Sequence, residues 1–217
     1  MNRSLFFLMV FTVYTFFIGG CTKNVTQVYT VYTNNFNNTD LKGVEVLGWL
    51  PNGQVGLFPS DAKFYQYQGS NMIGRLNNSR VGITISDLPP HTVVRAEFDL
   101  YLHEIWKNDI FVVRIDENFR LVSGFSNDSS VQQSYPNWIG NGTPLSPAGN
   151  LAQEIYLPST CGRTLPRGTS HYKMIHLMPH TSSKVTFDCS DTGGALNDTC
   201  SRSWSIDNLK ITVLKNQ

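Results

Sequence analysis

Strand-like alternation of apolar and polar residues runs through most of this chain and limits its fold more than any other feature. The pattern is clearest between Val93 and Leu102. Successive side chains of a strand point to opposite faces, so the apolar set predicts a core face and the other set an outer face. The core set is Val94, Ala96, Phe98, Leu100 and Leu102, and the outer set is Arg95, Glu97, Asp99 and Tyr101.

Similar short segments follow one another with turn signals between them, and no helical period of useful length interrupts them. This organisation predicts an all-β fold, a two-sheet antiparallel β-sandwich of jelly-roll type. Besides 93–102, the predicted strands are 28–33, 44–49, 63–67, 81–85, 110–115, 119–122, 184–189 and 209–214.

Three local features add detail to this fold. The polar tripeptide Asp116-Glu117-Asn118 separates two apolar runs and predicts a hairpin. The apolar phase slips between Trp204-Ser-Ile206 and Leu209, which predicts a bulge near Asp207-Asn208. The stretches LPPHTVVRAEFD from Leu88 and LMPHTSSKVTFD from Leu177 match at six positions, and predict two equivalent entries into strands.

The N-terminus predicts export. Fourteen residues from Leu5 to Ile18 span ~21 Å as a helix, too short for a ~30 Å hydrocarbon core, so residues 1–20 are interpreted as a signal peptide. Ile18-Gly19-Gly20-Cys21 resembles a bacterial lipobox, which predicts lipidation of Cys21, with 21–27 as the lipidated N-terminus and tether and 28–217 as the β-sandwich domain. The alternative is ordinary cleavage that leaves Cys21 a plain thiol.

Either interpretation takes the chain out of the cytoplasm, and the lipidated one places it in the cell envelope, on a bacterial outer membrane or cell surface. Only 15% of residues are charged and the formal net charge is +1, so no nucleic-acid partner is predicted. Six Asn-X-Ser/Thr sequons, which would suit a glycosylated eukaryotic protein, oppose the bacterial interpretation.

The cysteines suit an oxidising compartment. Cys189 and Cys200 flank a turn-rich stretch whose ends can meet, which favours a disulfide between them and leaves Cys161 as a free thiol. No CxxC pair presents two thiolates to a metal ion.

Three segments together resemble an extracellular jelly-roll domain of bacterial secreted and surface proteins, similar to concanavalin-like and carbohydrate-binding modules. They are MIGRLNNSRVGITISDLPPHTVVRAEFDLYLHEIW from Met72, QSYPN from Gln133 and SWSIDNLKI from Ser203. The resemblance covers most of residues 27–214 and implies the sandwich fold and a binding role, without one assigned ligand.

The chain departs from the family pattern where acidic residues are expected. It has Lys107 and Arg202 at such places, which weakens the case for a calcium ion, because calcium takes carboxylate and carbonyl oxygens. The weak candidate ligands that survive are Asp99, Asp109, Asp207 and Asn208. The preferred alternative is that Asp207 and Asn208 hold the bulge through side-chain hydrogen bonds.

Aromatic residues in polar loops are the candidate ligand contacts. Trp106 and Trp204 are interpreted as core residues, whereas Trp49 precedes a turn, and Tyr135 and Trp138 lie in a stretch rich in Asn, Gly and Pro. Glu97 and Asp99 share a strand face as a glycosidase pair would, but the third carboxylate of the glucanase-like pattern is absent.

The sequence therefore predicts a membrane-anchored, outward-facing, non-catalytic module that binds a glycan or another surface polymer. The alternatives are a structural or adhesive envelope protein and, third, a glycoside hydrolase.

Overall fold

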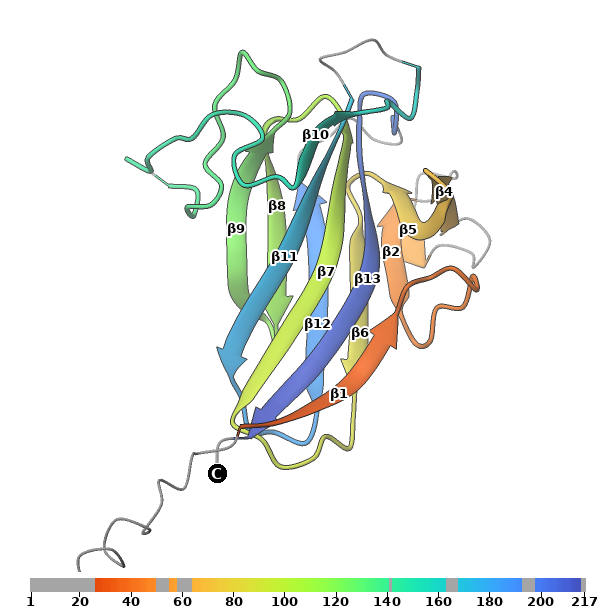
Figure 1. The fold of residues 1–217 in the computed structure, drawn as a ribbon, viewed down its shortest axis with the longest axis vertical. Helices are drawn as coiled ribbons and strands as arrows, with labels where there is room; N and C mark the ends of the chain where they lie inside the picture. The colour runs from red at the N-terminus through yellow and green to blue at the C-terminus, as the bar shows by residue number, and fades with distance from the viewer. Residues whose placement is uncertain are drawn as a thin grey trace, which may run out of the picture.

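The computed structural model describes residues 26–49, 55–57, 64–140, 142–162, 168–192 and 198–215. The described chain consists of strands and their connections (Figure 1), and none of it forms a helix long and apolar enough to cross a membrane. Two antiparallel sheets face each other, so the fold is the predicted β-sandwich of jelly-roll type. Cys21, and with it the predicted signal and most of the predicted tether, lie outside the described residues.

The larger sheet has seven strands. Its order is β10 (Glu154–Leu157), β11 (Thr169–Pro179), β7 (Val93–Glu104), β13 (Arg202–Lys215), β5 (Ser70–Leu76) and β4 (Phe64–Tyr67), and β1 (Gln27–Asn34) also pairs with β13. The smaller sheet has the order β3 (Val55–Leu57), β2 (Glu45–Trp49), β6 (Arg80–Ile85), β12 (Val185–Thr192), β8 (Lys107–Ile115) and β9 (Asn118–Ser126).

The core lies between the inner faces of the two sheets. The alternation predicted for the central strand is confirmed, because all five residues of its apolar set are buried. Phe98 of β7 meets Phe187 of β12 edge to face at 5.5 Å between ring centroids. Trp106 and Trp204 are also fully buried, as predicted, which leaves neither indole free to contact a ligand.

The predicted bulge is present in β13. Its register with β7 slips by one residue between Asp207 and Lys210, and Asn208 has a φ of 52°, a conformation that Asn tolerates better than most residues. The bulge also marks a change of neighbour. Before it β13 pairs with β5, at Trp204 and Ile206, and after it β13 pairs with β1, from Leu209 onward.

The predicted hairpin joins β8 to β9, with Ile115 opposite Asn118 and positive φ at both intervening residues. The two copies of the internal repeat lead into β7 and β12, one in each sheet. Equivalent residues of the copies touch each other at two places, Phe98 with Phe187 and His91 with His180.

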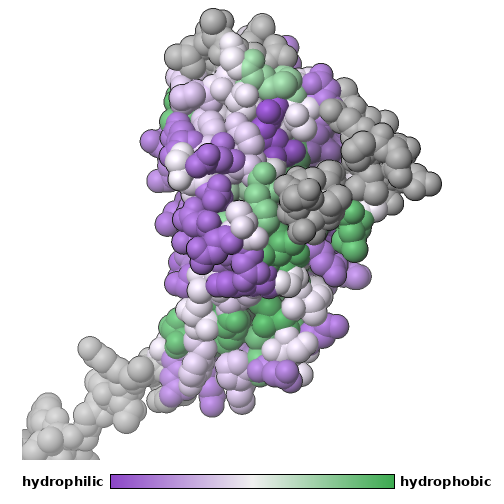
Figure 2. All heavy atoms as spheres, turned by 90° about the vertical axis from the view of Figure 1, so that its right-hand side faces the viewer, coloured by the Kyte–Doolittle hydropathy of each residue, from purple (hydrophilic) through white to green (hydrophobic). Residues whose placement is uncertain are grey.

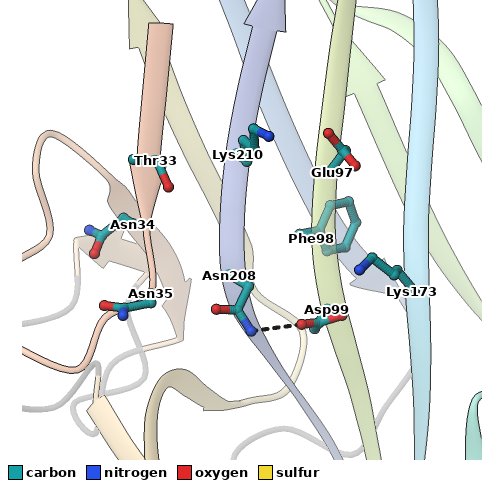
Figure 3. A pocket seen from close by; sticks show the side chains of 9 residues that line it. All are labelled: Thr33, Asn34, Asn35, Glu97, Phe98, Asp99, Lys173, Asn208 and Lys210. Atoms are coloured by element: carbon teal, nitrogen blue, oxygen red, sulfur yellow. Dashed lines mark hydrogen bonds between the residues drawn. The ribbon is translucent and has the colours of Figure 1, made fainter. Parts of the chain in front are cut away.

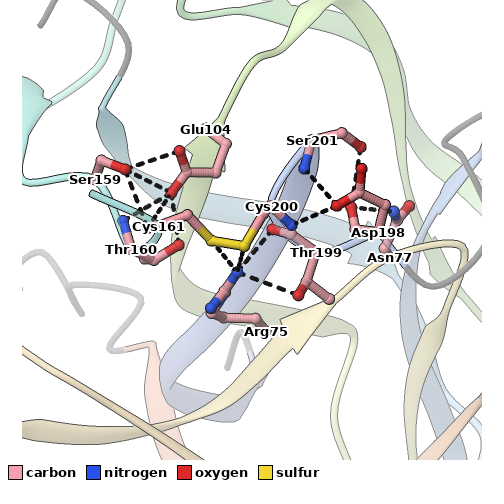
Figure 4. The surroundings of a disulfide bond; sticks show 10 residues. All are labelled: Arg75, Asn77, Glu104, Ser159, Thr160, Cys161, Asp198, Thr199, Cys200 and Ser201. Carbon is pink, nitrogen blue, oxygen red and sulfur yellow. Dashed lines mark hydrogen bonds between the residues drawn. A yellow bond between two sulfur atoms is a disulfide. The ribbon is translucent and has the colours of Figure 1, made fainter. Parts of the chain in front are cut away.

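The predicted disulfide is wrong. Cys200 bonds to Cys161 (Figure 4), whereas Cys189 is a buried free thiol of β12. The reason is the alternation of that strand: Val185, Phe187 and Cys189 all point into the core, so the Cys189 sulfur faces away from the loop that carries Cys200. Desolvation by burial raises the pKa of the Cys189 thiol well above its usual value.

Polar contacts hold the loop that carries Cys161. The buried Glu104 carboxylate, at the end of β7, accepts hydrogen bonds from the Ser159 and Thr160 hydroxyls and from the amides of Thr160 and Cys161, at 2.7–2.9 Å. On the other side, Arg75 donates to the carbonyl of Thr199 at 2.9 Å and lies beside both sulfur atoms. The disulfide therefore joins two loops that β5 and β7 already position (Figure 4).

Candidate functional site

The outer face of the seven-stranded sheet carries the strongest candidate site. Because side chains of paired residues lie on the same face, the register of β13, β7 and β11 arranges this face in rows. Three consecutive rows, each given in the strand order β13, β7, β11, are Lys210, Glu97, Ile175, then Asp207, Asp99, Lys173, then Ser205, Tyr101, His171. In Figure 2 hydrophilic side chains predominate along the left flank, where this outer face lies.

A depression of about 280 Å³ lies in the first two of these rows, beside the bulge. Two ammonium groups approach it from opposite sides, Lys210 from β13 and Lys173 from β11, with the carboxylates of β7 between them (Figure 3). β1 and the residue after it close the remaining side. The lining residues are Thr33, Asn34, Asn35, Glu97, Phe98, Asp99, Lys173, Asn208 and Lys210.

The bulge creates this site. The extra residue places Asn208 on the surface, where its Nδ2 donates to the Asp99 carboxylate at 2.7 Å. The switch of neighbours from β5 to β1 at the same point brings the end of β1 to the rim. The sequence therefore predicted the bulge correctly, but not the segments that meet there.

Asp99 and Asp207 lie directly opposite each other, and the pKa values of their carboxyl groups are shifted in opposite directions. Partial burial alone would raise the pKa of Asp99, but hydrogen bonds from His171 at 3.2 Å and from Asn208 bring it below its usual value. Burial raises the pKa of Asp207, and the nearby Asp99 charge adds to this rise. Of the two carboxyl groups, Asp99 is therefore the one that ionises more readily.

The candidate calcium ligands already take part in hydrogen bonds or ion pairs within the protein. Three of the four candidate ligands, Asp99, Asp207 and Asn208, do come together, but both oxygens of each carboxylate already have a hydrogen-bond partner. Asp109 lies elsewhere and pairs with Arg202 at 2.7 Å. In the described part of the chain no group of three His, Cys, Asp or Glu side chains is arranged to hold a metal. The observed bonds match the preferred interpretation, in which Asp207 and Asn208 hold the bulge.

A row of aromatic rings continues from the depression toward the disulfide. Tyr101 stacks on His171 at 4.6 Å between centroids, and Tyr67 of β4 meets Tyr101 edge to face at 6.0 Å. Burial, together with the charge of Asp99, raises the pKa of Tyr101 to about 12, so its hydroxyl stays protonated and can donate.

The predicted ligand contacts lie apart from this site. Trp138 is 50% exposed in the connection after β9, as its loop position predicted. Tyr135 stacks on Phe125 at 4.4 Å and also contacts Tyr172, so much of its ring is used in packing. Trp49 ends β2, which three strands separate from β9, and its side chain lies outside the described residues. The structure does not bring the three together.

Sequence reasoning missed Lys173 and Lys210, which flank the depression, and Asn35 at its rim. One signal for Lys210 was available: after the bulge, Lys210 alternates with Leu209 and Ile211 and so belongs to the outer face. No comparable signal existed for Lys173, because its strand was not predicted.

No protein-family model and no curated protein sequence matches this chain. Three similar solved structures share low identity with it. A family 35 carbohydrate binding module from Clostridium thermocellum has 10% identity and a TM-score of 0.35, over 86% of this chain and 97% of that one. TmCBM61 in complex with beta-1,4-galactotriose has 13% identity and a TM-score of 0.30, over 93% and 94% of the two chains.

Dimeric latent PorU from Porphyromonas gingivalis has 7% identity and a TM-score of 0.37, over 63% of this chain. The match spans 10% of the PorU chain. At such TM-scores these likenesses carry no argument about the ligand of this chain, and its function has to be argued from its own residues.

Proposed function

We propose that this chain is an exported, lipid-anchored, non-catalytic module that binds a neutral glycan in the depression beside the β13 bulge. The observation that carries the proposal is the lining itself. Amide, hydroxyl, ammonium and carboxylate groups from β1, β7, β11 and β13 converge on one open hollow of the sheet. An aromatic pair, Tyr101 and His171, stands in the next row.

The chemistry of the lining suits sugar hydroxyls. Each hydroxyl both donates and accepts hydrogen bonds, so a sugar site needs donors and acceptors side by side. Asn35 and Asn208 offer both kinds of atom, and the two lysines add donors. The charges of Lys173 and Lys210 balance those of Glu97 and Asp99, which supports a neutral ligand over an acidic one.

The placement of the termini is compatible with an anchored module. β1 begins at Gln27, opposite Lys215, at the end of the sandwich where β13 finishes (Figure 1). Cys21 lies six residues before Gln27, a span of at most ~22 Å of extended chain. An acylated Cys21 would hold this end near the membrane, with the depression facing sideways along the sheet.

A glycan array with residues 22–217, run with and without calcium, tests the proposal. The variants Lys210→Met and Lys173→Met remove the donors and keep the aliphatic stems, and we expect each to weaken binding about tenfold or more. Trp138→Ala is the matched control, because it truncates an exposed aromatic residue outside the depression. Loss of binding in Trp138→Ala alone would move the site to the loops. Silence of the array under both conditions would contradict glycan binding.

One observation favours the structural or adhesive alternative. Ile175 and Leu177 of β11 are 44% and 54% exposed, and within the described chain β11 has no strand beside it beyond its pairing with β10 and β7. An open strand edge with apolar side chains can pair with another protein. Crosslinking on intact cells tests this alternative: a partner that is lost in Ile175→Lys would support it.

A further inference from the structure

The strand-entry histidines of the internal repeat meet at one end of the sandwich. His91 precedes β7 and His180 follows β11, and both side chains are buried. His91 Nε2 lies 2.6 Å from His180 Nδ1. The ring planes are 14° apart and the centroids 4.9 Å apart, so the rings lie nearly in one plane and face each other edge to edge.

Each ring has a further contact on its other nitrogen. His91 Nδ1 lies 2.6 Å from the carbonyl oxygen of Pro89. His180 Nε2 lies 2.7 Å from the Asp116 carboxylate, off the ideal N–H direction, so we treat this contact as an ion pair. Asp116 is held in turn by the amide of Thr186 in β12, at 2.7 Å from its other oxygen. No other charged side chain contacts either imidazole among the residues that the structure describes.

Counting protons gives the state of this network. A carbonyl oxygen only accepts, so His91 Nδ1 must carry a proton. The short contact between the rings needs a second proton, and the contact between His180 and the carboxylate needs a third. Two neutral imidazoles and an ionised Asp116 hold only two protons between them, so one contact would then bring two lone pairs together.

A metal ion does not account for the arrangement. His91 Nε2 and His180 Nδ1 are closer together than two ligands of one zinc ion, whose bonds are each ~2.0–2.1 Å in tetrahedral geometry. The Asp116 carboxylate lies on the opposite nitrogen of His180 and so faces away from the gap between the rings.

We propose that His91, His180 and Asp116 form a proton-dependent latch that joins the two copies of the repeat. The network holds three protons on the two rings, so one imidazole is cationic beside the ionised Asp116. It locks the loop before β7 to the exit of β11 and the β8–β9 turn. The same segment bonds to the end of β13, because the amide of Thr92 donates to the carbonyl of Leu214 and the amide of His180 donates to the carbonyl of Thr92. Opening the latch therefore loosens the end of the sandwich where β1 and β13 pair.

The pH dependence follows from the same count. Two unfolded histidines have pKa values of ~6.5, so near pH ~6.5 the three unfolded groups also hold about three protons. Above that pH the unfolded chain holds fewer protons than the latch, and stability falls as pH rises, by up to about tenfold in the folding constant per pH unit. Below it the unfolded chain holds more, and stability falls as pH drops.

The acid side is not diagnostic, because burial also lowers the pKa of His103 to about 3 and of His176 to about 4. The alkaline side is diagnostic, and Asp116→Asn is the matched variant. The amide that replaces the carboxylate can still accept from Thr186 through its oxygen, and its nitrogen can donate to His180. Every contact is then satisfied with two ring protons, so the variant should lose the alkaline dependence.

Urea unfolding of residues 22–217 at pH 6.5, 7.5 and 8.5 measures this difference. We expect the unfolding constant of the native sequence to rise up to about tenfold per pH unit relative to Asp116→Asn. The same pH dependence of the unfolding constant in the native sequence and in Asp116→Asn would overturn the latch. If the variant fails to fold, side-chain ¹H–¹⁵N spectra of the native sequence at pH 7.5 still decide: three ring-bound protons on His91 and His180 support the latch, and two overturn it.

Discussion

Removal of the Cys161–Cys200 disulfide should cost about 4 kcal/mol of unfolding free energy. The two residues are 39 apart in sequence, and a cross-link that closes a loop of that size restricts the unfolded chain by an amount between the ~3 kcal/mol of a 15-residue loop and the ~4.7 kcal/mol of a 100-residue loop. The folded loop should persist in a Cys161→Ser, Cys200→Ser double variant, because Glu104 and Arg75 still hold its two sides. The loss therefore comes mainly from the freed unfolded chain.

Urea denaturation followed by tryptophan fluorescence measures this cost. The slope of the unfolding free energy against urea concentration shows whether the native sequence and the double variant expose a similar surface on unfolding. The matched control is Cys189→Ala, which removes a buried sulfur and no cross-link, and whose stability should remain sensitive to reductant. Reductant should lower the stability of the native sequence toward that of the double variant, and leave the double variant unchanged. Equal stability of the native sequence with and without reductant, or alkylation of Cys161 rather than Cys189 in the denatured oxidised protein, would refute the reasoning.

Three further predictions concern the framework around the site. Arg202→Met should cost about 3–5 kcal/mol in the same urea assay, because it leaves the fully buried Asp191 carboxylate without the guanidinium 2.8 Å away. Gly74→Ala should cost about 2 kcal/mol or more, since a Cβ there overlaps the Ser205 hydroxyl, and a normal melting temperature would contradict this. Stability should fall as pH drops below ~6.5, by up to about 1.4 kcal/mol per pH unit for each buried neutral histidine, and His103→Asn should flatten the pH profile.

The architecture could be predicted because the strand pattern is local. Alternation in 93–102 gave the buried face of the central strand, and the slip of phase near Asp207 gave the bulge. Both depend only on which side of a strand a residue occupies, and the two-residue alternation of apolar and polar side chains shows this directly. Strand β11 escaped prediction because its pattern is partly reversed: Ile175 and Leu177 point outward, while His176 points inward and is desolvated, with its pKa lowered to about 4.

The candidate site could not be predicted for a different reason. Its lining comes from strands that are distant in sequence, and only the pairing of β1 and β11 with the central strands brings Asn35 and Lys173 to Asn208. The disulfide pairing was predicted wrongly for the same reason, because the sequence does not show which distant segments are neighbours in the fold. Proximity in sequence favoured a bond between Cys189 and Cys200. However, Cys189 lies two residues after Phe187 and therefore on the same core-facing side of the strand. That local signal outweighs the closeness of the two cysteines along the chain.

The structure also bears on the six sequons as evidence for a glycosylated eukaryotic protein. The described residues include three of them, and two of these asparagines are buried. Asn127 donates from Nδ2 to the carbonyl of Gly168 at 3.1 Å and accepts from the amide of Trp106 at 2.8 Å, so a glycan on that nitrogen would break the loop. Asn77 donates from the same atom to Asp198 at 3.1 Å. Asparagine at these two positions serves loop geometry, so these two sequons are not evidence of glycosylation. The main sequence argument against acylation of Cys21 is therefore weaker than it looked, and mass spectrometry of the mature N-terminus tests the lipid directly.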